Sequence, residues 1–474
     1  MTTSTLWGRE RGWLSEEVVA GLMRMSDCLV VVASGGLADL HLPEMAGESV
    51  APLLMIIAVL LLLQMSGMLG AYSAAPRRDA AIPLRILAAW TVVVAVLIAA
   101  PLLYASTNLG LEVWIVYWYV YGAGGFTATH ILWNRWVQQR YRRGTLARRV
   151  VIAGTDDYAL PLARHLSRTR EASVHVLGLF CDQPEDCANA RPSPYPVLGG
   201  WEELEGFVRD RAVDAVVLAI PWHAEEYLQM WMARLRNLPV DVFLCPPASS
   251  TDQPAWCVSS MAGHRFLKVS ERPLEGWRYI AKAIEDRLLA FAILILFAPV
   301  MLLIAIMVRL DSPGAILFRQ KRYGFNNTVI EVLKFRSMTI TPESSDGAVR
   351  QACRHDSRLT RTGYWLRRTS LDELPQLFNV LRGEMSLVGP RPHAIAHNEQ
   401  YAAVIDTYVG RHRMKPGITG WAQVNGFRGE TDTLDKMENR VKFDLYYIEH
   451  WSILFDLYIL VRTLFVGFFH PNAY

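Results

Sequence analysis

The chain begins with four long apolar stretches that are separated by short polar connections. They cover about residues 19–38, 50–70, 83–105 and 112–133. Because a helix of about 20 apolar residues spans the hydrocarbon core of a bilayer, each stretch predicts a membrane-spanning helix. The first stretch contains Arg24 and Asp27 near its start, where we expect charged side chains to reach the membrane interface.

The charges of the connections alternate. Arg77 and Arg78 lie between the second and third stretches and Arg85 lies at the start of the third, whereas residues 41–48 and 108–112 contain no Lys or Arg. After the fourth stretch, residues 134–149 hold six arginines and no acidic residue. Because positive connections stay on the cytoplasmic side, both ends of the bundle are predicted to be cytoplasmic. Buried helices of a soluble protein would not need this pattern.

From residue 149 onward, short apolar runs alternate with amphipathic stretches. The predicted strands cover residues 150–153, 174–180, 215–220 and 240–244, and a helix is predicted over 159–168. Strands that alternate with helices indicate a Rossmann-like parallel sheet. Only Gly154 follows the first strand, and Asp156 and Asp157 come next. Because carboxylates repel phosphate at a helix N-terminus, we expect a structural or regulatory domain, with nucleotide binding as the alternative.

Residues 288–308 form an unbroken run of 21 apolar residues. Its length predicts a fifth span, but Lys282 and Arg287 precede it and Arg309 follows it, so both flanks have the charge of the cytoplasmic side. Pro299 near its middle removes a backbone donor and favours a break. We therefore expect a re-entrant hairpin of two half-helices over about residues 285–310. A kinked full span is the alternative.

Composition supports this organisation. The chain has 474 residues, of which 52% are hydrophobic and 20% charged, and its net charge is +3. The length predicts about three domains, with boundaries at 1–148, 149–270 and 271–474, and the small net charge does not favour nucleic acid as a partner. Six scattered cysteines indicate reduced thiols rather than a disulfide framework. Cys181 and Cys187 have no second pair nearby that would complete a metal site.

Two adjacent carboxylates, Asp372 and Glu373, follow the basic pair Arg367 and Arg368. Ser370 and Glu373 have the spacing of a capping box, and Pro375 is tolerated only in a first helical turn. A helix is therefore predicted to start near Asp372, where its dipole also favours anionic ligands. A plain helix cap is the alternative.

Three further motifs lie in the last third of the chain. They are Gly389-Pro390-Arg391-Pro392, Lys334-Phe335-Arg336-Ser337-Met338 and the segment from Lys415 to Gly426. The first presents a rigidly held guanidinium suited to phosphate, and a plain rigid turn is the alternative. The second places Lys334 and Arg336 on one strand face, which could instead be a solvated face. The third supplies glycines, amides and an aromatic ring suited to a nucleotide, and a turn-rich hairpin is the alternative. Together with a membrane-seated hairpin, they suggest phosphoryl chemistry on a lipid substrate with a hard cation.

These motifs, in this order, resemble the bacterial sugar transferase family of monotopic phosphoglycosyl transferases over about residues 275–474. The resemblance also uses Asp311-Ser312-Pro313-Gly314 and Thr369 through Gln376. The four spans and the degenerate Rossmann-like domain are similar to the large, multi-domain branch of the family. The tail, with Arg428, Arg440, Asp444 and the terminal Asn472-Ala473-Tyr474, resembles undecaprenyl-phosphate glucose phosphotransferases. Family members often carry Ser before the hairpin proline, where this chain has Ala298.

The resemblance implies an α-rich monotopic catalytic domain on the cytoplasmic face of the bacterial inner membrane. It would transfer glucose 1-phosphate from UDP-glucose to undecaprenyl phosphate, release UMP and begin an exopolysaccharide or capsule repeat unit. Asp372 would be the nucleophile of an aspartyl phosphosugar intermediate. Glu373 and Asp372 would hold Mg²⁺, with Asp444 as a further candidate. The remaining implied site residues are Arg336, Arg391, Lys334, Pro390, Pro392, Lys415, Gln423 and Arg428.

Three alternatives stay open at this point. The sugar could be galactose rather than glucose, because glucose depends on the tail alone. The chain could instead be a non-catalytic membrane scaffold of a polysaccharide assembly complex. An ordinary glycosyltransferase would usually hold its metal with an Asp-x-Asp pair, which this sequence lacks. The expected partners are a UDP-sugar, undecaprenyl phosphate and inner-membrane lipids, and a homodimer is left open.

Overall fold

The computed structural model forms two compact units, one mainly from residues 10–148 and one mainly from residues 149–474. The first is helical, and the second contains a sheet domain and the region that carries the motifs. The described residues are 15–42, 50–72, 81–103, 109–142, 146–154, 156–168, 174–181, 194–210, 213–220, 225–245, 259–261, 264–339, 358–427 and 433–469.

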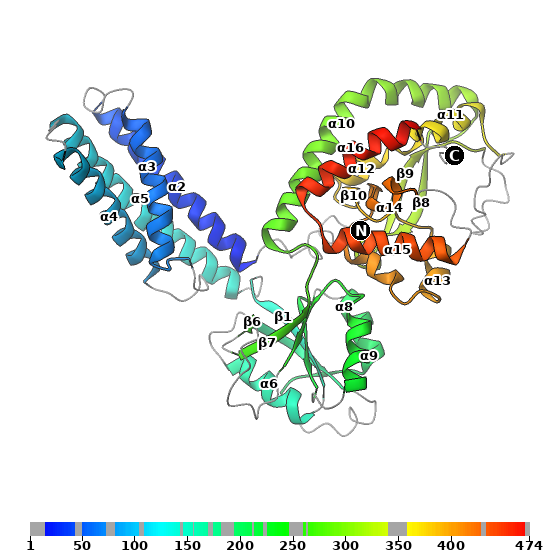
Figure 1. Cartoon of the computed structure of the whole chain (residues 1–474), viewed down its shortest axis with the longest axis horizontal. Coiled ribbons are helices and arrows are strands. Elements are labelled where there is room, and N and C mark those ends of the chain that lie inside the picture. Colours follow the sequence, from blue (N-terminus) through cyan, green and yellow to red (C-terminus); the bar gives the residue numbers. More distant parts are fainter. Residues whose placement is uncertain are drawn as a thin grey trace. The chain divides into compact units, whose positions relative to one another are not determined.

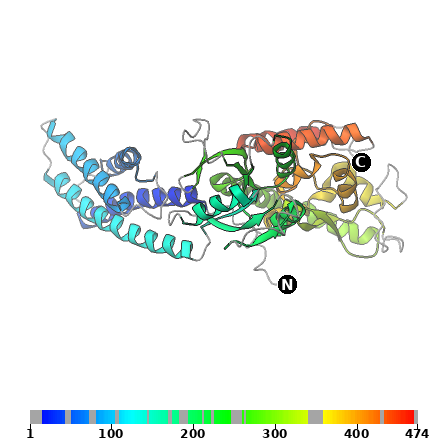
Figure 2. The same cartoon turned by 90° about the horizontal axis from the view of Figure 1, so that it is seen from below.

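Each of the four predicted apolar stretches forms a helix, and the four run side by side (Figure 1, Figure 2). They are α2 (Glu16–His41), α3 (Val50–Met68), α4 (Ile82–Leu103) and α5 (Leu109–Arg142). Within the described residues, α2, α3 and α4 are long and apolar enough to cross a membrane, and so is α10 of the second unit. The first unit is therefore a helical bundle suited to a bilayer.

Asp27 lies inside this bundle, where neighbouring helices cover its side chain, and does not point outward. Its side chain is buried, Nε2 of His130 lies 3.1 Å from its carboxylate, and the Tyr72 hydroxyl donates to the same carboxylate. These partners come from α5 and from the turn after α3. The polar contacts offset the cost of placing a carboxylate among apolar helices.

The predicted parallel sheet forms, with an addition at one edge. Its strand order is β3-β2-β1-β4-β5-β7-β6. β4 pairs in parallel with β1 and β5, whereas β7 pairs antiparallel with β5 and β6. The strands are β1 (Arg148–Gly154), β2 (Val174–Phe180), β3 (Val197–Gly199), β4 (Ala215–Ala219), β5 (Asp241–Leu244), β6 (Ser259–Met261) and β7 (His264–Ser270).

Helices cover both faces of this sheet, as in a doubly wound fold. α6 (Asp156–Arg168) lies on one face, and α8 (Trp201–Asp210) and α9 (Glu225–Leu235) lie on the other (Figure 1). Gly154 ends β1 with a φ of 152°, and a Cβ there would come within 2.2 Å of the Ala219 carbonyl oxygen. The single glycine is thus required by close strand packing, whatever the domain binds.

The last third of the chain folds around a core that includes Leu377, Leu387, Tyr447 and Ile459. A hairpin of β8 (Leu317–Tyr323) and β9 (Val329–Phe335) is followed by short elements that hold the motifs. These elements are α11 (Arg361–Thr369), η5 (Leu371–Glu373), α12 (Gln376–Leu381), β10 (Ser386–Val388), α13 (Ile395–Ala402), η6 (Tyr408–Arg413), β11 (Gly417–Thr419), α14 (Trp421–Val424), α15 (Leu434–Glu449) and α16 (Ile453–Phe469).

The apolar run around Pro299 belongs to one helix, α10 (Gly276–Asp311). The expected interruption into two half-helices is absent, although the ribbon bends between its ends (Figure 1). Because Pro removes a single donor, the neighbouring backbone hydrogen bonds can continue the helix through a bend. Large apolar side chains along the middle are exposed, for example Leu296 at 71% and Leu302 at 64%.

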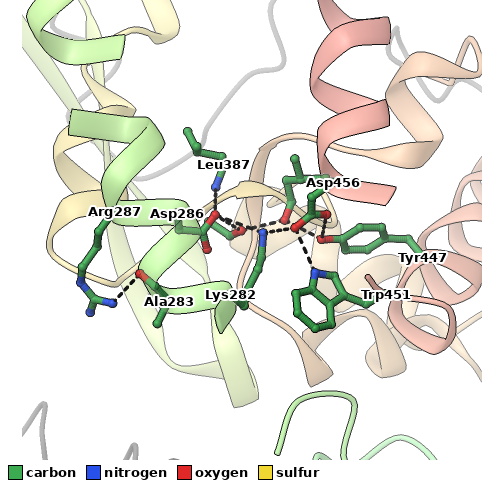
Figure 3. A network of polar contacts seen from close by, with 10 residues as sticks. Lys282, Ala283, Asp286, Arg287, Leu387, Tyr447, Trp451 and Asp456 are labelled. Atoms are coloured by element: carbon green, nitrogen blue, oxygen red, sulfur yellow. Dashed lines mark hydrogen bonds and ion pairs between the residues drawn. The ribbon is translucent and has the colours of Figure 1, made fainter. Parts of the chain in front are cut away.

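A network of buried polar contacts attaches the first part of α10 to the rest of this region (Figure 3). Nζ of Lys282 lies 3.1 Å from the Asp286 carboxylate and 2.6 Å from the Asp456 carboxylate on α16. The Leu387 amide donates to Asp286, and Trp451 Nε1 donates to Asp456. The other end of α10 contacts the same region, because the Thr362 amide donates to Asp311 at 2.9 Å.

Candidate active site

The two adjacent carboxylates occupy a tight turn between two helices. Asp372 and Glu373 lie in the 3₁₀ turn η5, and both side chains are buried. Ser370 ends α11 in the left-handed conformation, with a φ of 58°. The predicted capping box is therefore wrong, because Ser370 is a C-cap and the Glu373 side chain points to cations. The helix α12 starts after Pro375, slightly later than expected.

Glu373 is held by two cations. Its Oε1 lies 2.7 Å from Nζ of Lys334 and 2.6 Å from Nη2 of Arg391, and Oε2 lies 3.0 Å from Nη1 of Arg391. Burial alone would raise the pKa of this carboxyl, but Arg391 and Lys334 hold it well below its usual range. Glu373 is thus ionised and fixed in position.

Asp372 has the opposite environment. Within the described part of the chain, no hydrogen bond or ion pair holds its carboxylate, although Lys334, Arg367 and Arg391 are close enough for their charges to act on it. Burial, together with the negative charge of Glu373, raises the pKa of Asp372 to about 6. Two neighbouring carboxyls with separated pKa values are typical of an active site in which each has its own role.

The Gly389-Pro390-Arg391-Pro392 loop is anchored through its backbone. A Cβ at Gly389 would come within 2.5 Å of the Lys415 carbonyl oxygen, so only glycine allows this approach of the two segments. The Gly417 amide donates to the Pro390 carbonyl at 3.0 Å. Pro390 and Pro392 are both buried. This frame aims the Arg391 guanidinium at Glu373.

Some of the other predicted site residues lie near Arg391 and some do not. Oε1 of Gln423 accepts from Arg391 at 3.5 Å, whereas Nζ of Lys415 lies over the Tyr279 ring, 5.6 Å from its centroid. Arg336 donates to the Ser312 carbonyl at 2.6 Å and to other carbonyls at the end of α10. It therefore has partners other than the phosphate that we expected. Arg428 lies outside the described residues.

The residues can be tested for a fit to Mg²⁺. Within the described ranges, no group of three or more His, Cys, Asp or Glu side chains is placed to hold a metal ion. Asp444 is not brought to the carboxylate pair, since it lies 2.8 Å from Nε of Arg411 on η6. However, Mg²⁺ commonly takes one or two carboxylates and completes its shell with water and phosphate oxygens. Lys334 and Arg391 already engage both Glu373 oxygens, so within the described residues Asp372 is the carboxylate of the pair that is available for such a site.

Sequence reasoning missed several buried cations and one histidine near the loop. Arg322 donates to the Pro392 carbonyl, and Nη2 of Arg411 donates to the Arg391 carbonyl at 2.9 Å. Arg440, already named as part of the tail, is buried beside this group, and His393 is half-buried there with its Nε2 atom covered. The one signal in the sequence is the four-residue spacing of Arg440 and Asp444, which places both on one helix face.

The fold and the site define a membrane-associated transferase. A family model described as bacterial sugar transferase matches residues 277–470, and one described as a CoA-binding domain matches residues 67–246. The chain belongs to the bacterial sugar transferase family. It is therefore an enzyme and not a non-catalytic scaffold.

Named relatives extend this result. The chain is 35% identical over 476 residues to UDP-glucose:undecaprenyl-phosphate glucose-1-phosphate transferase of Escherichia coli (strain K12), covering 98% of this chain and 99% of the relative. The protein of the same name from Klebsiella pneumoniae is 38% identical over 359 residues, 76% of each chain. A UDP-galactose-lipid carrier transferase of Erwinia amylovora is 37% identical over 222 residues, 44% of this chain and 45% of the relative.

Proposed function

We propose that this enzyme transfers glucose 1-phosphate from UDP-glucose to undecaprenyl phosphate. The observation that carries the proposal is the difference between two adjacent carboxylates: Glu373 is locked by Lys334 and Arg391, whereas Asp372 is unengaged within the described residues. A locked carboxylate beside an available one suits covalent catalysis, because the nucleophile must be able to move onto the substrate. The names of the two long relatives support the substrates.

The reaction would proceed in two steps at Asp372. An Asp372 carboxylate oxygen attacks the β-phosphorus of UDP-glucose, the bond from that phosphorus to the bridging oxygen breaks, and UMP leaves with the electron pair. The product is an aspartyl phosphosugar. A phosphate oxygen of undecaprenyl phosphate then attacks the same phosphorus and displaces the Asp372 carboxylate. Arg391 and Lys334 would stabilise the negative charge on the phosphoryl oxygens.

Mg²⁺ is part of the proposal. Asp372 would supply a carboxylate oxygen to it and the substrate would supply phosphate oxygens, whereas Glu373 would have to give up part of its contacts with Lys334 and Arg391 to join them. When bound, the ion would neutralise charge on the diphosphate. Asp444 is less suited to this role, because Arg411 already engages it.

We further propose that α10 enters and leaves the membrane on the cytoplasmic side of the inner membrane. A straight helix of 36 residues would be about 54 Å long. If it crossed the bilayer, its two ends would lie on opposite sides, and a globular region on one side could not contact both of them. Here Lys282 near one end and Asp311 at the other both contact the catalytic region. Labelling of single cysteines at residues 288 and 308 from either side of the membrane tests this topology, and opposite accessibility would contradict it.

The sugar and the intermediate are tested together. The purified full chain is incubated with Mg²⁺ and each UDP-sugar, first without and then with undecaprenyl phosphate, and UMP is measured. We expect a stoichiometric burst of UMP and a phosphosugar adduct with UDP-glucose alone, and neither with the Asp372→Asn variant. An adduct on Asp372→Asn would exclude this nucleophile. Activity with UDP-galactose but not with UDP-glucose would establish the alternative sugar.

A further inference from the structure

Arg440 is a buried cation whose binding capacity is only partly used. Its side chain is 4% exposed, and its Nε and Nη2 atoms have no hydrogen-bond partner among the residues that the structure describes. The nearest acid on its own helix, Asp444, forms its ion pair with Arg411 instead, at 2.8 Å. A buried guanidinium without a direct ion pair is costly for the fold. Such a group is expected where an anionic ligand completes the pairing.

His393 presents a further unused donor in the same cluster. Nη1 of Arg411 lies 3.1 Å from Nδ1 of His393, and the Tyr408 hydroxyl lies 2.5 Å from the same atom. Because a guanidinium can only donate, Nδ1 is the acceptor, and the proton of the neutral ring is on Nε2. Burial and the surrounding arginines hold the pKa of His393 well below its usual range, so the ring stays neutral. Its Nε2 has no partner within the described ranges of the chain.

The cluster carries an excess of positive charge. Burial and the like charges of Arg411 and Arg391 lower the pKa of Arg440 to about 9, which leaves it protonated at neutral pH. Its charge acts on both His393 and Arg391, so it lies close to the catalytic loop. The described cations outnumber the carboxylates. The cations are Arg322, Lys334, Arg391, Arg411 and Arg440, and the carboxylates are Asp372, Glu373 and Asp444.

We propose that Arg440 and His393 form a phosphate-binding subsite behind the catalytic loop, in which the Arg440 Nε–H and Nη2–H and the His393 Nε2–H donate to phosphate oxygens. The inference rests on the proposed function, because that function supplies the substrates whose phosphate would bind here. The diphosphate of the sugar donor and the phosphate of the lipid acceptor share the required chemistry. Arg440 would thus be a substrate-binding residue separate from the pair Arg391 and Lys334, which engage Glu373.

The test compares Arg440→Met with Arg440→Lys and with Lys442→Met, a control that removes an exposed charge from the same helix. Inorganic pyrophosphate is the probe, and the thermal unfolding midpoint of the full chain in nanodiscs is measured with and without it. We expect pyrophosphate to raise the midpoint of the unmodified protein, Arg440→Lys and Lys442→Met, but not that of Arg440→Met. Without pyrophosphate, the midpoint of Arg440→Met should equal or exceed that of the unmodified protein, because an unpaired buried charge is removed.

Kinetics then identify the source of the phosphate. If the subsite serves the sugar donor, Arg440→Met raises the KM for UDP-glucose, measured in steady-state turnover with undecaprenyl phosphate, about ten- to a hundredfold, as expected for lost hydrogen bonds to a charged group. If it serves the lipid, the same rise occurs only in the KM for undecaprenyl phosphate. His393→Phe should weaken the same substrate less, and serves as the second variant if Arg440→Met does not fold.

An unchanged pyrophosphate shift together with unchanged KM values in Arg440→Met would overturn the inference and leave the proposed function intact. Conversely, an unmodified protein that releases no UMP, but whose pyrophosphate shift depends on Arg440, would support the subsite and contradict the proposed function. The two ideas therefore fail separately.

Discussion

The catalytic region contains two buried groups of ion pairs that differ in how completely their polar atoms are used. In the network around Lys282, both acids have several donors: Asp286 also accepts from the Leu387 amide, and Asp456 also accepts from Tyr447 and Trp451 (Figure 3). Here one cation sits between two carboxylates that neutral donors complete. Such a network specifies one arrangement of the chain.

The group around Glu373 has the opposite balance. Its described cations outnumber its carboxylates. Within the described residues, Asp372 has no partner and the Nε and Nη2 atoms of Arg440 are unpaired. Buried polar groups are normally satisfied, so an incomplete group indicates that a ligand supplies the missing partners. The contrast concerns the two acids that Lys282 joins and the carboxylates around Arg391. It does not extend to every buried acid, because Glu285 close to Lys282 also has two oxygens without a partner among the described residues.

The largest expected effect is on stability. Lys282→Met leaves Asp286 and Asp456 buried without their shared cation, and breaking a buried pair in this way costs about 3–5 kcal/mol. We expect a much lower thermal unfolding midpoint but an almost unchanged rate per folded molecule. Adding Asp456→Asn should restore part of the stability, because it removes one of the two stranded charges. A Lys282→Met protein as stable as the Lys442→Met control would remove the structural role of the network.

The second prediction concerns Glu373, whose substitution should lower the reaction rate more than the stability. Glu373→Gln removes the charge that Arg391 and Lys334 share, so the two cations lose their fixed orientation. We expect the rate of UMP release to fall about a hundred- to a thousandfold, as when a preorganised electrostatic group is lost from an active site. The unfolding midpoint should change less than in Lys282→Met. A Glu373→Gln protein that is strongly destabilised but fully active per folded molecule would show that Glu373 serves the fold and not the reaction.

Much of the fold could be predicted because it depends on local patterns. Apolar length located the four helices of the bundle, and the alternation of strands and helices located the sheet, since both report burial along a short segment. Pro299 predicts a disturbance of the helix at this position. It does not predict that α10 continues as one bent helix, because the loss of one hydrogen bond does not determine whether a helix stops or bends.

Long-range pairing could not be predicted. Lys282 and Asp456 are 174 positions apart, and Asp27 and His130 are 103 apart. A periodic pattern shows that a residue is buried but not which partner compensates its charge. The same limit hid His393 and the surroundings of Arg440, a residue that the tail motif named without showing that its donors are unpaired among the described residues. Asp372 and Glu373 could be found because they are adjacent in the sequence, but their different environments come from distant cations.

A third prediction removes a single neutral donor from the satisfied network. The Tyr447 hydroxyl lies 2.8 Å from the Asp456 carboxylate, while Lys282 and Trp451 also donate to that acid. Tyr447→Phe should therefore lower the free energy of unfolding by about 1–2 kcal/mol and leave the KM for UDP-glucose unchanged. Thermal unfolding and the UMP burst measure the two quantities. An altered KM would mean that the two groups are coupled and not independent.

The last prediction uses pH to separate the two carboxylates of the site. The nucleophile must be the carboxylate, and burial with the nearby Glu373 charge raises the pKa of Asp372 to about 6. In the absence of lipid acceptor the enzyme makes one burst of UMP, and the burst rate at low UDP-glucose concentration reports the free enzyme. This rate should therefore fall as the pH drops through 6, by about tenfold for each unit below it. Leaving out undecaprenyl phosphate removes the titration of the acceptor phosphate.

The unfolding midpoint over the same range serves as the control, since acid unfolding would imitate the loss of activity. Because Lys334 and Arg391 keep Glu373 ionised well below this range, a flat profile from pH 7 to 5 would show that Asp372 is not the group whose deprotonation starts the reaction.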